Sequence, residues 1–162
     1  MKWTWPLPGE DKYTSHAGMF AAIRKFDIHC GQDLYCNPNQ VVIAVEPGEV
    51  VAIEEFTGEH ANPPSPWWNN TKAILVEGPS GVVVYGELKP LDSIKIGKKI
   101  SQGQNLGHIV TVLKEDKGTP MAMLHIELYK PGTRETVVWN LGEPQPDNLL
   151  DVSEKLFKKR HV

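Results

Sequence analysis

A few residues of this sequence have the types and the placement that a metal site requires. His29 and Asp33 stand four apart in "FDIHCGQD", with Gly31 between them, and His125 lies far along the chain in "MAMLHIELY". Two histidines and a carboxylate around one ion, with the fourth position left to water, form a recurrent catalytic zinc arrangement. Such donors suit zinc better than magnesium or calcium, which prefer oxygen ligands alone. A His-x3-Asp pair also arises by chance, so two unrelated surface residues are the alternative.

The segment "MAMLHIELY" predicts a strand, in which successive side chains point to opposite faces. One face is an apolar stripe that should meet the core, and it consists of Leu124, Ile126 and Leu128. The other face consists of Met123, His125, Glu127 and Tyr129. His125 therefore stands beside a carboxylate on a rigid element, where a metal ligand can be held firmly.

The middle of the chain predicts further β-structure. The segment "QVVIAVEPGEVVAIEEF" contains two β-branched runs around Pro47-Gly48, a pair that fits the centre of a type II turn and predicts a hairpin. The segment "AILVEGPSGVVVYGEL" has the same design, with residues 78–81 at the turn. Short strands separated by regular turn signals favour an all-β sandwich or barrel.

Two segments differ from this pattern. "TGEHANPPSPWWNNTK" is rich in proline and asparagine, which predicts a surface loop that carries Trp67 and Trp68. The tail "PDNLLDVSEKLFKKRHV" has Leu149 and Val152 at helical spacing and a cationic end, so we expect a short C-terminal helix over about residues 148–160.

Length and composition exclude several classes of protein. The 162 residues suit one domain with a core, and a net charge of −3 gives no electrostatic footprint for nucleic acid. No apolar run approaches a membrane span, and the N-terminal segment has no apolar core of a secretory signal. We therefore expect a monomer made in the cytoplasm, which either acts there or is released by other means. Cys30 and Cys36 are expected to be free thiols rather than a disulfide.

Five segments, in order, resemble peptidase family M23, the lysostaphin-type zinc metallopeptidases that cleave peptidoglycan. "HCGQD" has the family's His-x-Gly-x-Asp form, and "VVIAVEPGEVVAIE" is similar to its first hairpin. "VVVYGEL" stands at its Tyr-x-His-Leu strand, "IKIGKKISQGQNLG" is similar to its glycine-spaced segment, and "LHIEL" is similar to the end of its His-x-His-x-Glu strand. The resemblance covers residues 26–150 and implies a single domain over residues 1–162. It also implies an enzyme that is released to a cell wall, as phage enzymes are, or a relative that acts in the cytoplasm.

This resemblance implies both a fold and a metal site. The fold is an all-β barrel-sandwich hybrid (duplicated hybrid motif) of antiparallel strands with a short C-terminal helix. The site is one zinc ion in a groove, held by His29, Asp33 and His125, with peptidoglycan or another peptide as substrate. Glu127 is then expected to orient a ligand through a hydrogen bond, with an exposed strand carboxylate as the alternative.

Two histidines of the family's motifs are absent. Glu87 stands at the histidine of Tyr-x-His-Leu, and Met123 stands at the first histidine of His-x-His. In the family this pair acts on the zinc-bound water and on the developing oxyanion, and methionine offers neither proton acceptor nor donor for these tasks. Glu87 either replaces the histidine as general base, as a glutamate does in D,D-dipeptidase and hedgehog-like zinc peptidases, or is a solvated carboxylate in a site that has lost its chemistry. The second reading matches the non-catalytic leukocyte-derived chemotaxin branch, which "HCGQDLYC" resembles.

Two hypotheses about function follow. The first is a zinc metalloendopeptidase that acts on peptidoglycan cross-links, with Glu87 as candidate base toward water that zinc acidifies to a pKa of about 7. The second is a catalytically degenerate, zinc-containing module that binds a peptide or glycan. A lipoyl-type carrier would need a modifiable lysine at a hairpin tip, and "VEPGEV" has none.

Four residues are candidates for the walls of the substrate groove, namely Met123, Tyr85, Trp67 and Trp68. Paired aromatic side chains present large surfaces with polar handles and bind peptide or glycan faces well. The alternative for the two tryptophans is that they pin their loop to the core. Alternation along "VVVYGEL" places Glu87 on the same face as Val83 and Tyr85, which the resemblance directs into the groove.

Overall fold

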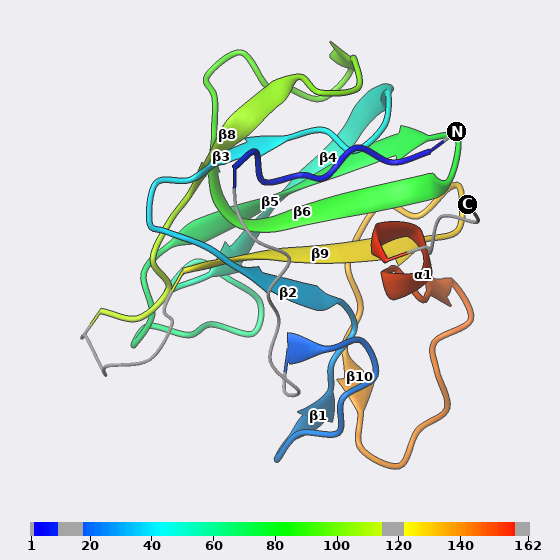
Figure 1. Ribbon diagram of the computed structural model, residues 1–162. Coiled ribbons are helices and arrows are strands. Elements are labelled where there is room, and N and C mark those ends of the chain that lie inside the picture. The colour runs from blue at the N-terminus through cyan, green and yellow to red at the C-terminus, as the bar shows by residue number, and fades with distance from the viewer. Residues whose placement is uncertain (1, 10–17, 115–121, 158–162) are drawn as a thin grey trace.

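The computed structural model describes residues 2–9, 18–114 and 122–157, and it consists almost entirely of antiparallel strands (Figure 1). None of the helical structure in these ranges has the length and apolar character needed to cross a membrane. The elements are β1 (Asp27–Ile28), β2 (Gln32–Tyr35), β3 (Val41–Ile43), β4 (Gly48–Thr57), β5 (Thr71–Gly78), β6 (Gly81–Pro90), β7 (Lys99–Ile100), β8 (Asn105–Ile109), β9 (Met123–Tyr129), β10 (Trp139–Asn140), β11 (Leu149–Leu150) and α1 (Ser153–Leu156).

The main sheet follows the order β11-β9-β6-β5-β4-β7, with β2 added to β9 and with β8 and β3 joined through β6. A separate two-stranded ribbon, β1 with β10, lies below this sheet in Figure 1. The predicted all-β fold of antiparallel strands with little helix is confirmed.

The two predicted hairpins have different outcomes. Strands β5 and β6 form the second one, closed by the pair Gly78↔Gly81 around Pro79 and Ser80. The first prediction is wrong, because β3 pairs with β8 whereas β4 pairs with β5 and β7. Gly48 serves strand packing instead of a turn, since a Cβ there would lie 2.4 Å from the Glu77 carbonyl oxygen.

The C-terminal helix is shorter than expected and begins later. Leu149 and Leu150 form β11 on the edge of β9, and α1 begins at Ser153. The Asp151 carboxylate accepts hydrogen bonds from the Ser153 N–H (2.9 Å) and hydroxyl (2.5 Å), which directs the chain into the helix at this point. The last residues of the predicted helix, 158–160, lie outside the described residues.

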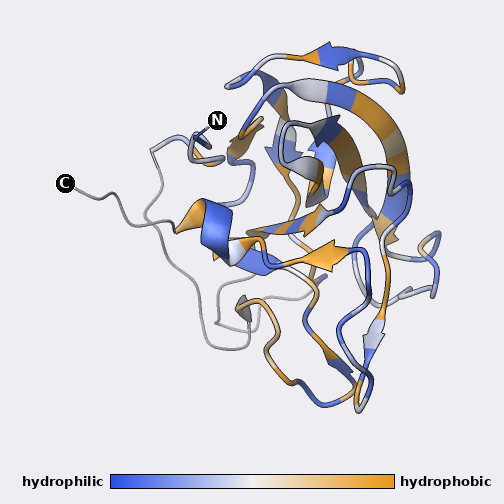
Figure 2. Ribbon diagram, turned by 90° about the vertical axis from the view of Figure 1, so that its right-hand side faces the viewer, coloured by the Kyte–Doolittle hydropathy of each residue, from blue (hydrophilic) through white to orange (hydrophobic). Residues whose placement is uncertain are grey.

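The central strands are buried on both faces, and hydrophobic segments run along them (Figure 2). Val83 and Tyr85 of β6 face one apolar cluster, whereas Val82 and Val84 face a second. This alternation follows from the period of two in a strand. In β9 the predicted apolar stripe lies in the first cluster, which leaves His125 and Glu127 on the opposite face.

Strand register places the chemistry-bearing residues side by side. His125 of β9 pairs with Asp33 of β2 on one side and with Gly86 of β6 on the other. Residues directly opposite in a sheet have Cβ atoms about 5 Å apart. Three strands therefore bring Asp33, His125 and the segment that carries Glu87 to one place.

Candidate metal centre

Three ligand atoms from His29, Asp33 and His125 face one another. Asp33 Oδ1 lies 2.8 Å from His125 Nδ1 and 3.4 Å from His29 Nε2, and the two histidine nitrogens are 3.2 Å apart. In a tetrahedral zinc site with bonds of about 2.0–2.2 Å, the ligand atoms are separated by roughly 3.3–3.6 Å. The triangle has nearly these dimensions, and its three residues are buried.

The residue between the two ligands of the first segment explains how that segment fits. A Cβ on Gly31 would lie 2.4 Å from the Ile126 carbonyl oxygen and 2.8 Å from Glu127 Cγ. Only glycine therefore lets the chain cross β9 this closely. The close crossing carries His29 over β9, while Asp33 enters β2 and pairs with His125.

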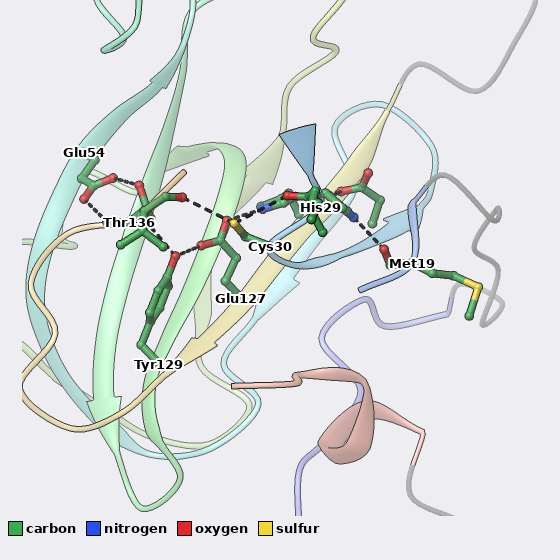
Figure 3. A network of polar contacts seen from close by, with 11 residues as sticks. Met19, His29, Cys30, Glu54, Glu127, Tyr129 and Thr136 are labelled. Carbon is green, nitrogen blue, oxygen red and sulfur yellow. Dashed lines mark hydrogen bonds and ion pairs between the residues drawn. The ribbon is translucent and has the colours of Figure 1, made fainter. Parts of the chain in front are cut away.

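Hydrogen bonds on the far side of each imidazole fix its orientation. His29 Nδ1 lies 3.0 Å from the Met19 carbonyl oxygen, which can only accept, so Nδ1 carries the proton and Nε2 presents a lone pair (Figure 3). His125 Nε2 lies 2.5 Å from Glu127 Oε2 and donates to that carboxylate, so His125 Nδ1 presents a lone pair. Two nitrogen lone pairs and a carboxylate oxygen converge, an arrangement that calls for a cation.

When no metal ion is bound, a proton on His125 supplies part of the positive charge that the converging lone pairs and the Asp33 carboxylate favour. Burial alone would lower the pKa of His125, but the Glu127 charge and the hydrogen bonds with Asp33 and Glu127 outweigh it and raise that pKa well above its usual value. Burial likewise opposes ionisation of Asp33, yet hydrogen bonds from His125 and His29 lower its pKa well below the usual range. A metal ion must therefore displace a proton to bind here.

Glu127 and Tyr129 support His125 from behind. Glu127, which the sequence left open between a supporting and an exposed role, is buried and contacts His125. Its second oxygen, Oε1, accepts a hydrogen bond from the Tyr129 hydroxyl, which itself accepts the Val137 N–H at 3.1 Å. Sequence reasoning did not single out Tyr129, although its place on the same strand face as His125 and Glu127 was a usable signal.

Glu87 lies beside the centre on a distorted part of β6. The pairing of β5 with β6 shifts between Lys72 and Ile74, and Glu87 has a left-handed backbone with φ of 67°. A residue with a side chain pays roughly 1–2 kcal/mol for this conformation, so it marks local strain. The bulge breaks the alternation of the strand, which separates Glu87 from the face of Val83 and Tyr85.

The Glu87 carboxylate is unusual in its surroundings. The residue is half-buried, but its Oε2 atom is buried and has no hydrogen-bond partner within the described residues. Burial and the nearby Asp33 charge raise its pKa to about 8, although His125 acts in the opposite direction. Glu87 is not among the residues whose ligand atoms lie within 4.8 Å of one another, but it directly follows Gly86, the cross-strand partner of His125.

The groove candidates fall into different places. Tyr85 is fully buried in the core, and its hydroxyl accepts the Val45 N–H at 3.0 Å, so the expectation that it lines a groove is wrong. The reason is that Tyr85 precedes the bulge and packs into the core, whereas the bulge turns Glu87 away from the core. Met123 is half-buried at the start of β9, opposite Tyr35 of β2.

Trp67 and Trp68 are exposed, with 65% and 37% of their surfaces accessible and their rings edge to face at 6.3 Å. Their loop is held by the Asn69 side chain, which donates to the Thr111 carbonyl at 2.8 Å, and by a backbone bridge between Trp68 and Leu113. The loop follows β4, which ends at Thr57 and carries Phe56, whose ring lies 5.2 Å from the His125 ring.

Comparisons with known proteins agree with this architecture. The sequence model of peptidase family M23 matches residues 27–137. Among curated proteins, none matches this sequence.

Several solved structures share the fold at low sequence identity. The crystal structure of cbpa from L. salivarius REN is 22% identical, covers 96% of this chain and 97% of its own, and has a TM-score of 0.58. The catalytic domain of the prophage-encoded M23 protein EnpA from Enterococcus faecalis, solved as a mutant, is 20% identical with coverage of 86% and 98% and a TM-score of 0.54. Helicobacter pylori Csd3 is 16% identical with a TM-score of 0.52; it covers 88% of this chain, which spans only 37% of Csd3.

Proposed function

This chain belongs to peptidase family M23, and from that premise we propose that it is a zinc metallopeptidase acting on the peptide cross-links of peptidoglycan. One observation carries the proposal: Glu87 follows Gly86, the cross-strand partner of His125, and its buried Oε2 has no hydrogen-bond partner among the described residues. A ligand triangle alone would suit a structural ion. A strained residue that keeps an unsatisfied acceptor beside the triangle is a feature that catalysis explains and packing does not.

His29, Asp33 and His125 would hold the ion, because two imidazole nitrogens and one carboxylate oxygen are the donors of a catalytic zinc site with one position open. Zinc, when bound, polarises the scissile carbonyl and makes water a stronger acid. The chain's own residues prepare this chemistry. Met19 and Glu127 hold the two imidazoles with their lone pairs toward the centre.

Glu87 would serve as the general base and then as the general acid. Its carboxylate takes a proton from the attacking water, whose oxygen forms the new bond to the scissile carbonyl carbon. It then gives that proton to the amine that leaves when the peptide bond breaks. Burial and the charge of Asp33 raise the pKa of this carboxyl to about 8 in the metal-free protein, and the positive charge of a bound zinc ion would lower it, so that Glu87 can take a proton near neutral pH and then return it.

The exposed tryptophan pair would form one wall of the substrate groove. Trp67 and Trp68 offer exposed aromatic surface on the loop that follows β4, the strand whose Phe56 ring lies 5.2 Å from the His125 ring. Met123, at the first position of β9, adds apolar surface near the same centre. These three residues would bind the substrate rather than take part in proton transfer.

The second candidate function is a zinc-containing module that binds peptide or glycan and cuts nothing. Met123 favours it, because a thioether can neither move a proton nor donate a hydrogen bond to an oxyanion. The proposed enzyme therefore has one acid/base group where its relatives' motif has two.

Digestion of cross-linked peptidoglycan by the zinc-loaded protein tests the two candidates. Glu87→Gln keeps the shape of the side chain, and we expect it to retain zinc and fold but to lose at least about a hundredfold in rate. Glu59→Gln is the matched control, because the Glu59 side chain is 64% exposed and pairs only with His60 among the described residues. Equal rates in the parent and Glu87→Gln remove Glu87 from the mechanism. A parent that binds these walls without releasing fragments favours the binding module.

A further inference from the structure

A chain of polar contacts runs from the metal centre along one face of β9 to Val137 (Figure 3). His125 Nε2 donates to Glu127 Oε2, and the Tyr129 hydroxyl donates to Glu127 Oε1. The hydroxyl oxygen of Tyr129 accepts the Val137 N–H at 3.1 Å. His125, Glu127 and Tyr129 stand at alternate positions of β9, so one strand face presents all three in a row.

We propose that Tyr129 is a positioning residue for the metal centre, and that its hydroxyl increases zinc affinity through Glu127 and His125. This inference rests on the proposed metal site. It goes further by assigning a role to a residue that does not reach the ion.

The direction of each hydrogen bond supports this role. A backbone N–H can only donate, so the Tyr129 oxygen accepts from Val137 and its single proton goes to Glu127. Glu127 then has one oxygen engaged by Tyr129 and the other by His125. The carboxylate cannot rotate without losing one of these bonds, and it is thereby kept from swinging toward the ion. The imidazole of His125 is in turn held with Nδ1 toward Asp33.

The segment that supplies the Val137 N–H is itself anchored. The Thr136 N–H and hydroxyl donate to the two oxygens of Glu54, each at 2.8 Å. The Val137 carbonyl oxygen also lies 3.5 Å from the Sγ atom of Cys30, the residue that follows His29 in the chain. Glu54 of strand β4 therefore holds Thr136, and with it the neighbouring Val137 that donates to Tyr129. The outer end of the network is thus anchored to the sheet.

Tyr129→Phe tests the role, because the ring that fills the second apolar cluster remains and only the hydroxyl is lost. Tyr85→Phe is a matched control: its hydroxyl is equally buried and also accepts a backbone N–H, from Val45 at 3.0 Å, but it contacts no part of the centre. Each variant leaves one buried N–H without its acceptor, so both should melt somewhat below the parent without metal.

The decisive measurement is the zinc dissociation constant by chelator competition. We expect Tyr129→Phe to bind zinc about tenfold or more weakly, the range seen when such outer partners are removed, and Tyr85→Phe to match the parent. Nitrogen NMR of the metal-free protein provides a second readout. The Nε2 proton of His125 should give the same signal in the parent and in Tyr85→Phe, and it should exchange faster only in Tyr129→Phe.

The outcomes separate the inference from its premise. If the parent binds zinc and Tyr129→Phe binds it as tightly, the positioning role is overturned while the metal site stands. A parent that binds no zinc overturns both. Should Tyr129→Phe fail to fold, Glu127→Gln takes its place, since its amide can still accept from Tyr129 while its NH2 group faces His125; unchanged zinc affinity in that variant also overturns the proposal.

Discussion

Asp33 and His125 are cross-strand neighbours on β2 and β9, and Asp33 Oδ1 lies 2.8 Å from His125 Nδ1. Two residues paired by strand register need no loop to bring them together, so this half of the centre is as rigid as the sheet. The third residue, His29, depends on the chain crossing β9 at Gly31. In the metal-free protein a proton shared by Asp33 and His125 occupies the position that a metal ion would take, and metal binding and pH dependence are therefore coupled.

His125→Ala should remove the stabilisation by zinc. An ion that binds the native protein but not the unfolded chain contributes about 4 kcal/mol at a thousandfold excess over Kd. We expect the parent to gain melting temperature with added zinc, and His125→Ala to gain none. His60→Ala is the control, because that side chain is 65% exposed and does not belong to the ligand group. A zinc-dependent gain in His125→Ala equal to that of the parent would contradict the ligand assignment.

The metal-free protein should lose stability as pH rises from about 4.5 to 8. The pKa of Glu87 is raised from 4.5 to about 8 by burial and by Asp33, so its contribution is fully present below pH 4.5 and is lost as pH rises through about 8. The raised pKa of His125 acts with the same sign at higher pH. Urea unfolding at pH 5 and pH 8 measures this, with chelator present. Glu87→Gln should show a smaller loss than the parent; an equal loss would mean that Glu87 titrates normally.

Gly31→Ala should disturb both stability and metal binding. The added Cβ would meet the Ile126 carbonyl oxygen at 2.4 Å, a backbone atom that cannot move aside without breaking β9, so we expect a loss of about 2–3 kcal/mol or more. Gly103→Ala is the control, since nothing lies within 4 Å of its Cβ and only its φ of 83° is unfavourable, at about 1 kcal/mol. Comparable melting temperatures for the two variants would show that the crossing at Gly31 is not tight.

Cys30 should resist alkylation in the folded protein. Burial, then the charge of Glu127, raises the pKa of its thiol from 9.0 to about 12, and the thiolate is the reactive form. Iodoacetamide at pH 8, followed by peptide mass spectrometry, should leave Cys30 unmodified in buffer and modify it in urea. Rapid modification of Cys30 under native conditions would show that this part of the centre opens readily.

Trp67→Ala should affect binding and leave stability nearly unchanged. An exposed side chain contributes little to folding, so we expect a change within about 0.5 kcal/mol. Trp139→Ala is the contrast, because that indole is buried and donates to the Glu143 carbonyl at 2.9 Å, and its loss should cost about 3–5 kcal/mol. Cosedimentation with peptidoglycan should weaken for Trp67→Ala. Unaltered cosedimentation would exclude Trp67 from the groove wall.

Local sequence pattern predicts some of this molecule well. The two faces of β9 follow from alternation, and the hairpin of β5 and β6 follows from a proline and glycines between β-branched runs. The hairpin at Pro47-Gly48 was wrong because a Pro-Gly pair also suits the start of a strand that packs closely against another. The local sequence cannot distinguish a turn from the start of such a strand, because the difference depends on pairing with β5, more than 20 residues further along the chain.

The surroundings of Glu87 show the same limit at the site. Its position in the order of motifs was readable, but its left-handed backbone results from a shift in pairing between β5 and β6. Counting alternate positions from Val83 therefore placed Glu87 wrongly on the same strand face as Tyr85. The hydrogen bond between Glu54 and Thr136 could not be predicted either, because no local pattern around one residue indicates contact with the other.

The support of His29 comes from the main-chain carbonyl of Met19, and the Met19 side chain is itself 46% exposed. Every amino acid carries that carbonyl, so position 19 is free to drift during evolution while the imidazole keeps its orientation. The two histidines are thus unequally constrained: the partner of His125 is the side chain of Glu127, whereas the partner of His29 is a main-chain group that any residue can supply. An insertion or deletion between positions 19 and 29 would be far more harmful than any exchange of the side chain at position 19.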